Sequence, residues 1–217
     1  MVNSKPKITL SAAITLDGKL SQKNKKIVLS SKSDKIRVHK LISKFDAILI
    51  GKNTVEQDNP LLTVRHVRGK NPIRIILDSQ GTIKNTSKII KTAKNIPTII
   101  VISQLVSKRN FNRLKKLPLD VIICGKTQVN ITKLVHILFK KGIKKILLEG
   151  GGTVNLSFLK NNLIDEIIIT VTPLILGSQN SVNLFEGNLL KSITKSPILK
   201  LKKVQKNKNE IILHYKL

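Results

Sequence analysis

The sequence predicts an α/β fold with a mixed, mostly parallel central sheet. Apolar runs without polar alternation recur along the chain, as in strands that are covered on both faces. Segments of helical periodicity separate these runs, and the repeated order strand, helix, strand is typical of a parallel sheet. The tail differs, because residues 199–201 and 211–215 alternate around a turn at 207–209. We therefore expect helices on both faces of the sheet and a C-terminal antiparallel hairpin.

The individual elements follow from these patterns. The predicted strands are residues 7–14, 46–50, 73–77, 97–102, 120–124, 144–148 and 167–172. Ser31 and Asp34 resemble a capping box, and they precede a predicted helix with the apolar stripe Val38, Leu41, Ile42 and Phe45. Further helices are predicted at residues 108–116, around the stripe Ile131, Leu134, Val135 and Leu138, and after Thr153, which is expected to be an N-cap. Residues 54–65 are interpreted as a polar segment with a turn at Pro60.

Composition favours one globular domain. The chain has 217 residues, 41% of them hydrophobic, and contains no linker, internal repeat or low-complexity tract. We therefore expect residues 1–217 to form a single domain. The single cysteine, Cys124, excludes an internal disulfide, and no stretch has the length and apolarity of a membrane span or signal peptide. A cytoplasmic protein is the expectation.

The formal net charge of +28 raises the alternative of nucleic-acid binding. The charge comes mostly from lysines scattered over every segment, and aromatic residues, which would stack on bases, make up 3% of the chain. A solvated basic surface, which would also attract anionic substrates, is the favoured interpretation. A basic nucleic-acid-binding protein remains the second alternative.

The segment Gly150-Gly151-Gly152-Thr153 is the strongest local pattern. A predicted strand enters it and a predicted helix leaves it, so free backbone N–H groups and the positive end of a helix dipole face one spot. The absence of side chains would let a phosphate or pyrophosphate approach the backbone. The adjoining Glu149 is an acid in a basic and apolar neighbourhood, and it favours a site over a plain turn.

Other polar residues lie at the ends of predicted strands. These are Thr54 and Asp58 after one strand, and Asp78 and Ser79 after another. Because parallel strands end at one edge of a sheet, these residues are expected to converge with the glycine turn on a nucleotide-type cofactor and a small second ligand. A P-loop is excluded, because Asp46 occupies the position of its first glycine. No histidine and cysteine cluster has metal-ligand spacing, so no metal site is predicted.

The same segments resemble the reductase family of riboflavin biosynthesis. The matching motifs run in order along nearly the whole chain: residues 15–19 (TLDGK), Gly51 to Arg65 (GxxTVxxDNPxLTVR), 72–79 (PxR leading into LDS), 148–152 (LEGGG), 163–166 (LIDE) and 173–177. Each motif alone is weak evidence, whereas the ordered set is specific.

The resemblance implies a dihydrofolate-reductase-like fold, a homodimer, and NADPH, possibly NADH, as hydride donor. Carried over position by position, the cofactor contacts would be Ala13, Thr54, Asp58, Asp78, Ser79, Gln80, Gly81, Gly150, Gly151, Gly152 and Thr153. Asp17, Arg65 and Glu149 would contact substrate, with Arg65 at a phosphate. The implied reaction reduces 2,5-diamino-6-ribosylamino-4(3H)-pyrimidinone 5′-phosphate to its ribitylamino product, with hydride delivered to C1′ of the ring-opened ribosylamine. Asp58 and Glu149 are the candidate proton donors.

One position departs from the family pattern. A second arginine that supports the substrate phosphate usually follows the motif Val-His-x-Leu, but here Ile42 follows Leu41. Either Lys40, His39 or another lysine supplies that charge, or phosphate affinity is lower, or the substrate differs. A dihydrofolate-reductase-like enzyme acting on another pterin or pyrimidine is the first alternative function.

Overall fold

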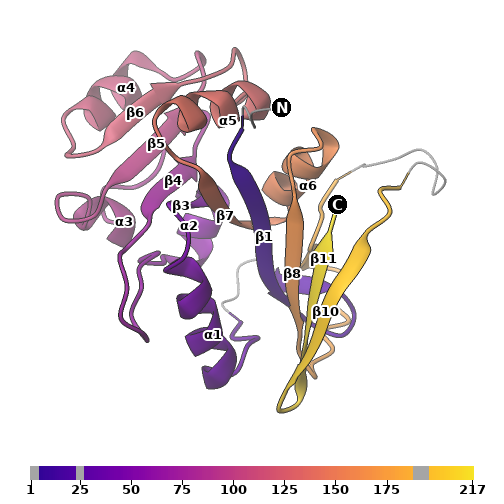
Figure 1. Ribbon diagram of the computed structural model, residues 1–217. Coiled ribbons are helices and arrows are strands. Elements are labelled where there is room, and N and C mark those ends of the chain that lie inside the picture. The colour runs from indigo at the N-terminus through magenta and orange to yellow at the C-terminus, as the bar shows by residue number, and fades with distance from the viewer. Residues whose placement is uncertain (1–4, 23–26, 188–195) are drawn as a thin grey trace.

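The computed structural model describes residues 5–22, 27–187 and 196–217. Within these ranges the long strands are β1 (Lys7–Ile14), β3 (Ala47–Gly51), β4 (Ile73–Leu77), β5 (Thr98–Ile102), β6 (Asp120–Ile123), β7 (Lys145–Gly150), β8 (Glu166–Val171), β10 (Lys200–Asn207) and β11 (Glu210–Lys216). They form a nine-stranded sheet in the order β10-β11-β8-β1-β7-β3-β4-β5-β6 (Figure 1). A separate small sheet pairs β2 (Lys19–Gln22) with β9 (Ser181–Asn183).

The pairing confirms the predicted fold class. From β8 to β6 all neighbouring strands are parallel, whereas β11 pairs antiparallel with both β8 and β10. The C-terminal hairpin, in yellow in Figure 1, therefore extends one edge of a parallel sheet. β7 lies between β1 and β3 although it follows β6 in the chain.

Helices cover both faces, as expected from apolar strands. The helices are α1 (Lys32–Ile42), α2 (Lys52–Asp58), α3 (Lys88–Lys91), α4 (Lys108–Lys115), α5 (Ile131–Lys140) and α6 (Gly152–Lys160). Apolar residues of α5 and α6 pack on one face with Ile8, Leu49 and Leu148. Residues of α1 to α4 pack on the other face with Ile48, Ile50 and Leu147. Because successive strand residues point to opposite faces, each apolar run supplies both cores.

Three predictions about local structure were wrong. Residues 52–58 form the helix α2 and not only a polar turn, because Val55 is buried against the sheet. Thr153 is not an N-cap: α6 begins at Gly152, and Gly151 occupies the cap position. Phe45 lies beyond the end of α1, although it packs in the same core as Ile42. Ser31 does cap α1, with its hydroxyl accepting a hydrogen bond from the Asp34 N–H.

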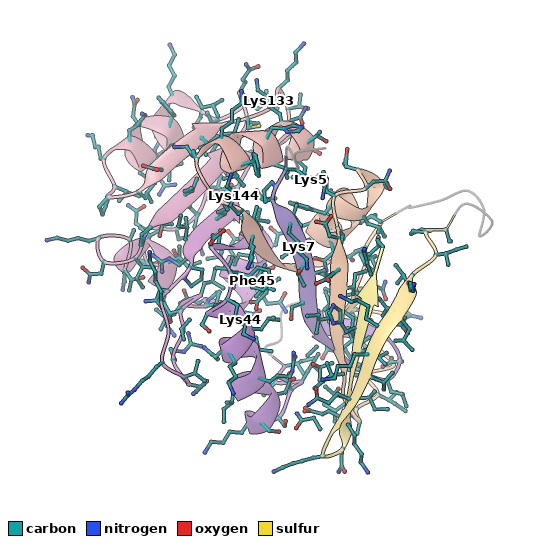
Figure 2. The ribbon with its side chains drawn as sticks, viewed as in Figure 1. Lys5, Lys7, Lys44, Phe45, Lys133 and Lys144 are labelled. Atoms are coloured by element: carbon teal, nitrogen blue, oxygen red, sulfur yellow. The ribbon has the colours of Figure 1, made fainter. Side chains whose placement is uncertain are left out.

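The basic charge is distributed over the molecule. The labelled lysines in Figure 2 lie on different elements, with Lys7 on β1, Lys133 on α5 and Lys44 just after α1. No helix within the described ranges has the length and apolarity needed to cross a membrane.

Candidate active site at the carboxyl edge of the sheet

The parallel strands open at one place along their carboxyl edge. Hydrogen-bonded pairing between β1 and β7 ends at Leu10 and Leu148, whereas β1 continues beside β8 as far as Ile14. Beyond Leu10 and Leu148 no backbone ladder joins β1 to β7. This is also the point where the strand order reverses, since β7 returns between β1 and β3. In open α/β sheets such a switch point is where ligands bind.

The glycine turn lies on this edge. Gly150 and Gly151 have φ angles of 51° and 80°, a left-handed region that favours glycine. A Cβ on Gly151 would lie 3.1 Å from the Thr54 hydroxyl oxygen. The nine-residue helix α6 follows, and the first N–H groups of any helix lack an intrahelical partner. A side-chain-free turn before a helix N-terminus therefore fits a pyrophosphate group.

Two neighbouring segments support this turn. The Thr54 hydroxyl donates a hydrogen bond to the Gly150 carbonyl oxygen at 3.2 Å, which ties α2 to the turn. On the other side, the Gly152 carbonyl accepts a hydrogen bond from the Glu186 N–H at 3.1 Å. The Asn155 side-chain amide donates to the Leu184 carbonyl at 2.9 Å. The structure thus joins Thr54 to the turn, and it packs Gly152 beneath residues 183–186.

Glu149 occupies a β-bulge. Leu49 of β3 pairs with Leu148 and Ile50 pairs with Gly150, so Glu149 is the extra residue between them. Bulges redirect side chains and are common beside active sites. Glu149 is partly exposed as a residue, whereas its carboxyl group is closely surrounded by protein atoms. Burial raises the pKa of Glu149 to about 7, and the positive charge of Arg65 opposes this rise. Near neutral pH the carboxyl group therefore exists in both protonation states.

Arg65 shares this side of the site with Glu149. It lies in the segment between α2 and β4, and its side chain is exposed. Its guanidinium donates to the Thr63 hydroxyl at 3.1 Å, and its backbone N–H donates to Nδ1 of His39 at 3.0 Å. His39 is buried on α1, with only 6% of its surface exposed. No sequence pattern predicts this contact, because His39 lies off the apolar stripe of the helix.

The Asp78 loop forms a separate part of the edge. The Asp78 carboxylate is 3% exposed and accepts hydrogen bonds from the Ile83 N–H at 2.7 Å and the Thr82 hydroxyl at 3.4 Å. The Ser79 hydroxyl accepts from the Val129 N–H at 3.2 Å. Gln80 and Gly81 complete the turn, with Gly81 at φ 64°. The loop ends β4, two strands from β7, which corresponds to roughly 10 Å. An elongated ligand could reach both this loop and the glycine turn.

The remaining predicted residues have different surroundings. Ala13 is half-buried near the end of β1, opposite Thr170 of β8. Asp17 accepts backbone hydrogen bonds from Leu176 and Gly177 at 3.0 and 2.9 Å, so its carboxylate fixes the loop after β8. A hydrogen bond from Thr15 and these two N–H groups hold the pKa of Asp17 well below its usual value. Asp58 is exposed at the end of α2.

Two open surface depressions lie away from these residues. One of about 460 Å³ is on α5, and one of about 350 Å³ lies between α1 and the hairpin. Of the residues considered for the site, only Lys40 lines either depression, so the candidate site rests on strand ends and on the contacts around Glu149 and Gly150. Within the described ranges, no group of three or more His, Cys, Asp and Glu side chains could hold a metal ion.

These features define a class: a parallel α/β protein whose sheet edge combines a switch point, a glycine turn and an acid of raised pKa. The chain belongs to the RibD C-terminal domain family, whose match covers residues 6–213. This confirms the predicted family relationship.

Two curated relatives span most of the chain. A protein of Aquifex aeolicus (strain VF5), named 2,5-diamino-6-ribosylamino-4(3H)-pyrimidinone 5′-phosphate reductase, is 33% identical over 195 residues, or 87% of this chain and 86% of the relative. The protein of that name from Methanothermobacter thermautotrophicus is 32% identical over 214 residues, or 97% of this chain and 98% of the relative.

Solved structures share the fold. Acinetobacter baumannii RibD matches with a TM-score of 0.85 at 24% identity, over 100% of this chain and 59% of that longer chain. The Saccharomyces riboflavin biosynthesis reductase Rib7 matches with a TM-score of 0.74 at 23% identity, over 100% of this chain and 91% of its own. At these identities the likeness supports the fold alone.

Proposed function

We propose that the protein reduces 2,5-diamino-6-ribosylamino-4(3H)-pyrimidinone 5′-phosphate to the ribitylamino product in riboflavin biosynthesis, with a nicotinamide dinucleotide as reductant. The observation that carries the proposal is that the glycine turn, Glu149 and Arg65 lie close together at the switch point of the sheet. The two named reductases that span most of the chain support the substrate class.

The residues at the glycine turn fit a reduced dinucleotide. Gly150 and Gly151 leave the backbone accessible, and the start of α6 favours negative charge. In the proposal Gly150, Gly151 and Thr153 hold the pyrophosphate. Ala13, residues 54–58 and the loop 78–81 contact the rest of the dinucleotide. When bound, the nicotinamide supplies a hydride. We propose NADPH as the donor, with NADH as the comparison in every assay.

Glu149 is the proposed proton donor. Reduction of the ring-opened ribosylamine adds a hydride to C1′ and a proton to the imine nitrogen, so one group in the site must release a proton. The raised pKa of Glu149, about 7, keeps a fraction of this carboxyl protonated at neutral pH. Asp58 is exposed at the end of α2, and no comparable burial supports it as an acid.

Arg65 is the proposed phosphate ligand. Its exposed guanidinium lies within electrostatic reach of Glu149 and is fixed on one side by Thr63. The family's second arginine has no equivalent at Ile42, which is 5% exposed in the core beneath α1. His39 cannot replace its charge near neutral pH, because burial and the neighbouring Arg65 lower the pKa of His39 to about 4. In the proposal the exposed Lys40 supplies additional positive charge.

The assembly and location are part of the same proposal. We propose that residues 1–217 act as one reductase domain, since β1 and β11 belong to one sheet. A homodimer is supported by β10, an edge strand that leaves Leu201 and Val204 about half exposed, at 51% and 55%. A cytoplasmic location is supported by the one free cysteine, Cys124. Light scattering during size-exclusion chromatography tests the dimer, and a mass of one chain would refute it.

The decisive experiment follows the absorbance of reduced cofactor with the purified protein. The substrates are the ribosylaminopyrimidine phosphate, its dephosphorylated form, and dihydrofolate as a pterin. We expect turnover with the phosphate compound and a loss of about 10²- to 10⁴-fold in Glu149→Gln, the range for removal of a general acid. Faster turnover of the dephosphorylated compound or the pterin would favour the alternative reductase functions. If none of these substrates leads to oxidation of the reduced cofactor, the proposal is refuted.

A further inference from the structure

We propose that His39 is a positioning residue for Arg65: its ring clamps the backbone of residues 63–65 onto α1 and directs the Arg65 guanidinium toward Glu149. The inference rests on the proposed function for its effect on catalysis. The placement of Arg65 can be tested without any turnover.

The geometry joins His39 to Arg65 by one hydrogen bond and one close approach. The Arg65 N–H donates to Nδ1 of His39 at 3.0 Å, and the guanidinium Nη2 lies 3.4 Å from the His39 Nε2. The Thr63 backbone also forms a hydrogen bond with the ring. The ring of His66 packs edge-on against His39, with centroids 4.5 Å apart. One imidazole thus contacts three positions of the same segment: 63, 65 and 66.

The hydrogen bonds assign a tautomer. Since Nδ1 accepts the Arg65 N–H, the proton of the neutral ring resides on Nε2. A positively charged ring would lose the acceptor at Nδ1 and would face the Arg65 charge. Burial and that charge depress the pKa of His39, so the ring is neutral and the contact is intact at neutral pH. His39 therefore acts as an uncharged spacer between α1 and the arginine.

α1 provides a fixed base for this contact. The Asp34 carboxylate, 1% exposed, accepts from Arg37 at 2.7 Å and from the Thr170 hydroxyl at 3.0 Å, which attaches the helix to β8. At the start of the helix, the Ser31 hydroxyl donates to Glu210 of β11 at 2.7 Å. Ile42 anchors the last turn in the core. Because the helix is held at both ends, the His39 ring has a defined position relative to the sheet and to Glu149.

Substitutions separate positioning from bulk stability. His39→Asn keeps an acceptor near the Nδ1 position, His39→Gln offers an amide only toward the Nε2 side, and His39→Leu removes both polar atoms. If His39 positions Arg65, KM for the phosphate substrate should rise about 10-fold in His39→Leu and His39→Gln, a loss that corresponds to ~1.4 kcal/mol. His39→Asn should restore most of the loss, and KM for the dinucleotide should not change.

A double-mutant cycle tests the coupling. In an Arg65→Ala background, His39→Leu should add less than about twofold to KM, since the arginine that it positions is gone. Independent, multiplicative effects of the two substitutions would overturn the proposal. Equal losses in His39→Asn and His39→Gln would overturn it as well, because only the former preserves the acceptor for the Arg65 N–H.

A carboxyl-carbon NMR titration of Glu149 gives a readout that needs no activity. Arg65 lowers the pKa of Glu149 in the intact protein, so Arg65→Ala should raise that pKa. His39→Leu should raise it in the same direction, and His39→Asn should not. If the wild-type protein reduces none of the substrates, the proposed function fails while this titration still decides the role of His39. A Glu149 pKa that responds to Arg65→Ala but not to His39→Leu would refute the positioning role.

Discussion

Arg74 is a buried cation with no carboxylate partner among the residues that the structure describes, and its replacement tests which of two opposing effects dominates. The residue is 0% exposed in β4. Its guanidinium donates to three backbone carbonyls and two threonine hydroxyls, those of Leu61, Ile89, Ile96, Thr92 and Thr98, at 2.6 to 3.3 Å. It thereby joins the segment after α2, the helix α3 and the start of β5.

The magnitudes favour the hydrogen bonds over the charge penalty. Burial lowers the pKa of Arg74 from 12.5 to about 10, which corresponds to a cost of ~3 kcal/mol for keeping it charged. Replacement by methionine would relieve this cost. It would also leave three carbonyls, one buried and two part-buried, without this donor, at about 2 kcal/mol each, or ~6 kcal/mol together. We therefore expect Arg74→Met to lower the free energy of unfolding by ~3 kcal/mol and Tm by about 6–12 °C.

Urea unfolding followed by circular dichroism measures this change. Arg109→Met is the matched control, because Arg109 is exposed on α4 and its loss should change stability by less than about 0.5 kcal/mol. Arg74→Lys keeps the charge but loses the planar fork, so it should also destabilise the protein. An Arg74→Met protein as stable as the wild type, or more so, would show that charge burial outweighs the hydrogen bonds and would refute the reasoning.

Three further predictions concern the glycine turn, an ion cluster and the thiol. Gly151→Ala and Gly142→Ala both force alanine into positive φ, at 80° and 85°, and each should cost about 1–2 kcal/mol of stability. Only Gly151→Ala should weaken dinucleotide binding in a fluorescence titration. Equal binding by both variants would show that the turn is not part of the site. Burial raises the pKa of Glu166, but hydrogen bonds from Lys202 and Lys7 outweigh it and lower the pKa to about 2. Its stabilising contribution is therefore present above the unfolded pKa of 4.5 and lost as the pH falls toward 2. Glu166→Gln should reduce the loss of unfolding free energy in acid by about 1–2 kcal/mol, after allowance for the half-exposed lysines. An unchanged pH profile of unfolding would contradict this prediction. Cys124 is 1% exposed with a raised pKa, so a thiol reagent should label it only after unfolding, and rapid labelling of the native protein would be inconsistent with its burial.

The strands were predictable because burial on both faces leaves a strong signal. Residues 7–14 and 73–77 were predicted with the bounds that β1 and β4 have, and the other long parallel strands differ by one or two residues. α2 was missed because Asn53, Thr54 and Val55 are poor helix formers. Its helical state comes from packing of Val55 under the sheet, which sequence periodicity over seven residues does not reveal.

The site was only partly predictable, for a related reason. The glycine turn and Glu149 are contiguous, so their proximity is visible in the sequence. The bulge at Glu149 depends on how β7 pairs with β3, and the burial of His39 depends on a segment that folds back from beyond α2. Such contacts join distant parts of the chain, and no local pattern encodes them. The resemblance to a family supplied Arg65, which composition alone would not have distinguished from other basic residues.

The insertion of β7 between β1 and β3 has a consequence for synthesis on the ribosome. Until residue 150 has left the exit tunnel, β1 and β3 have no neighbour in common, and the nascent sheet lacks its middle strand. The edge that carries the candidate site is therefore assembled after most of the supporting helices have emerged. We expect nascent chains arrested before Lys145 to be digested readily by protease and chains that include α6 to be resistant, and early resistance would contradict this order.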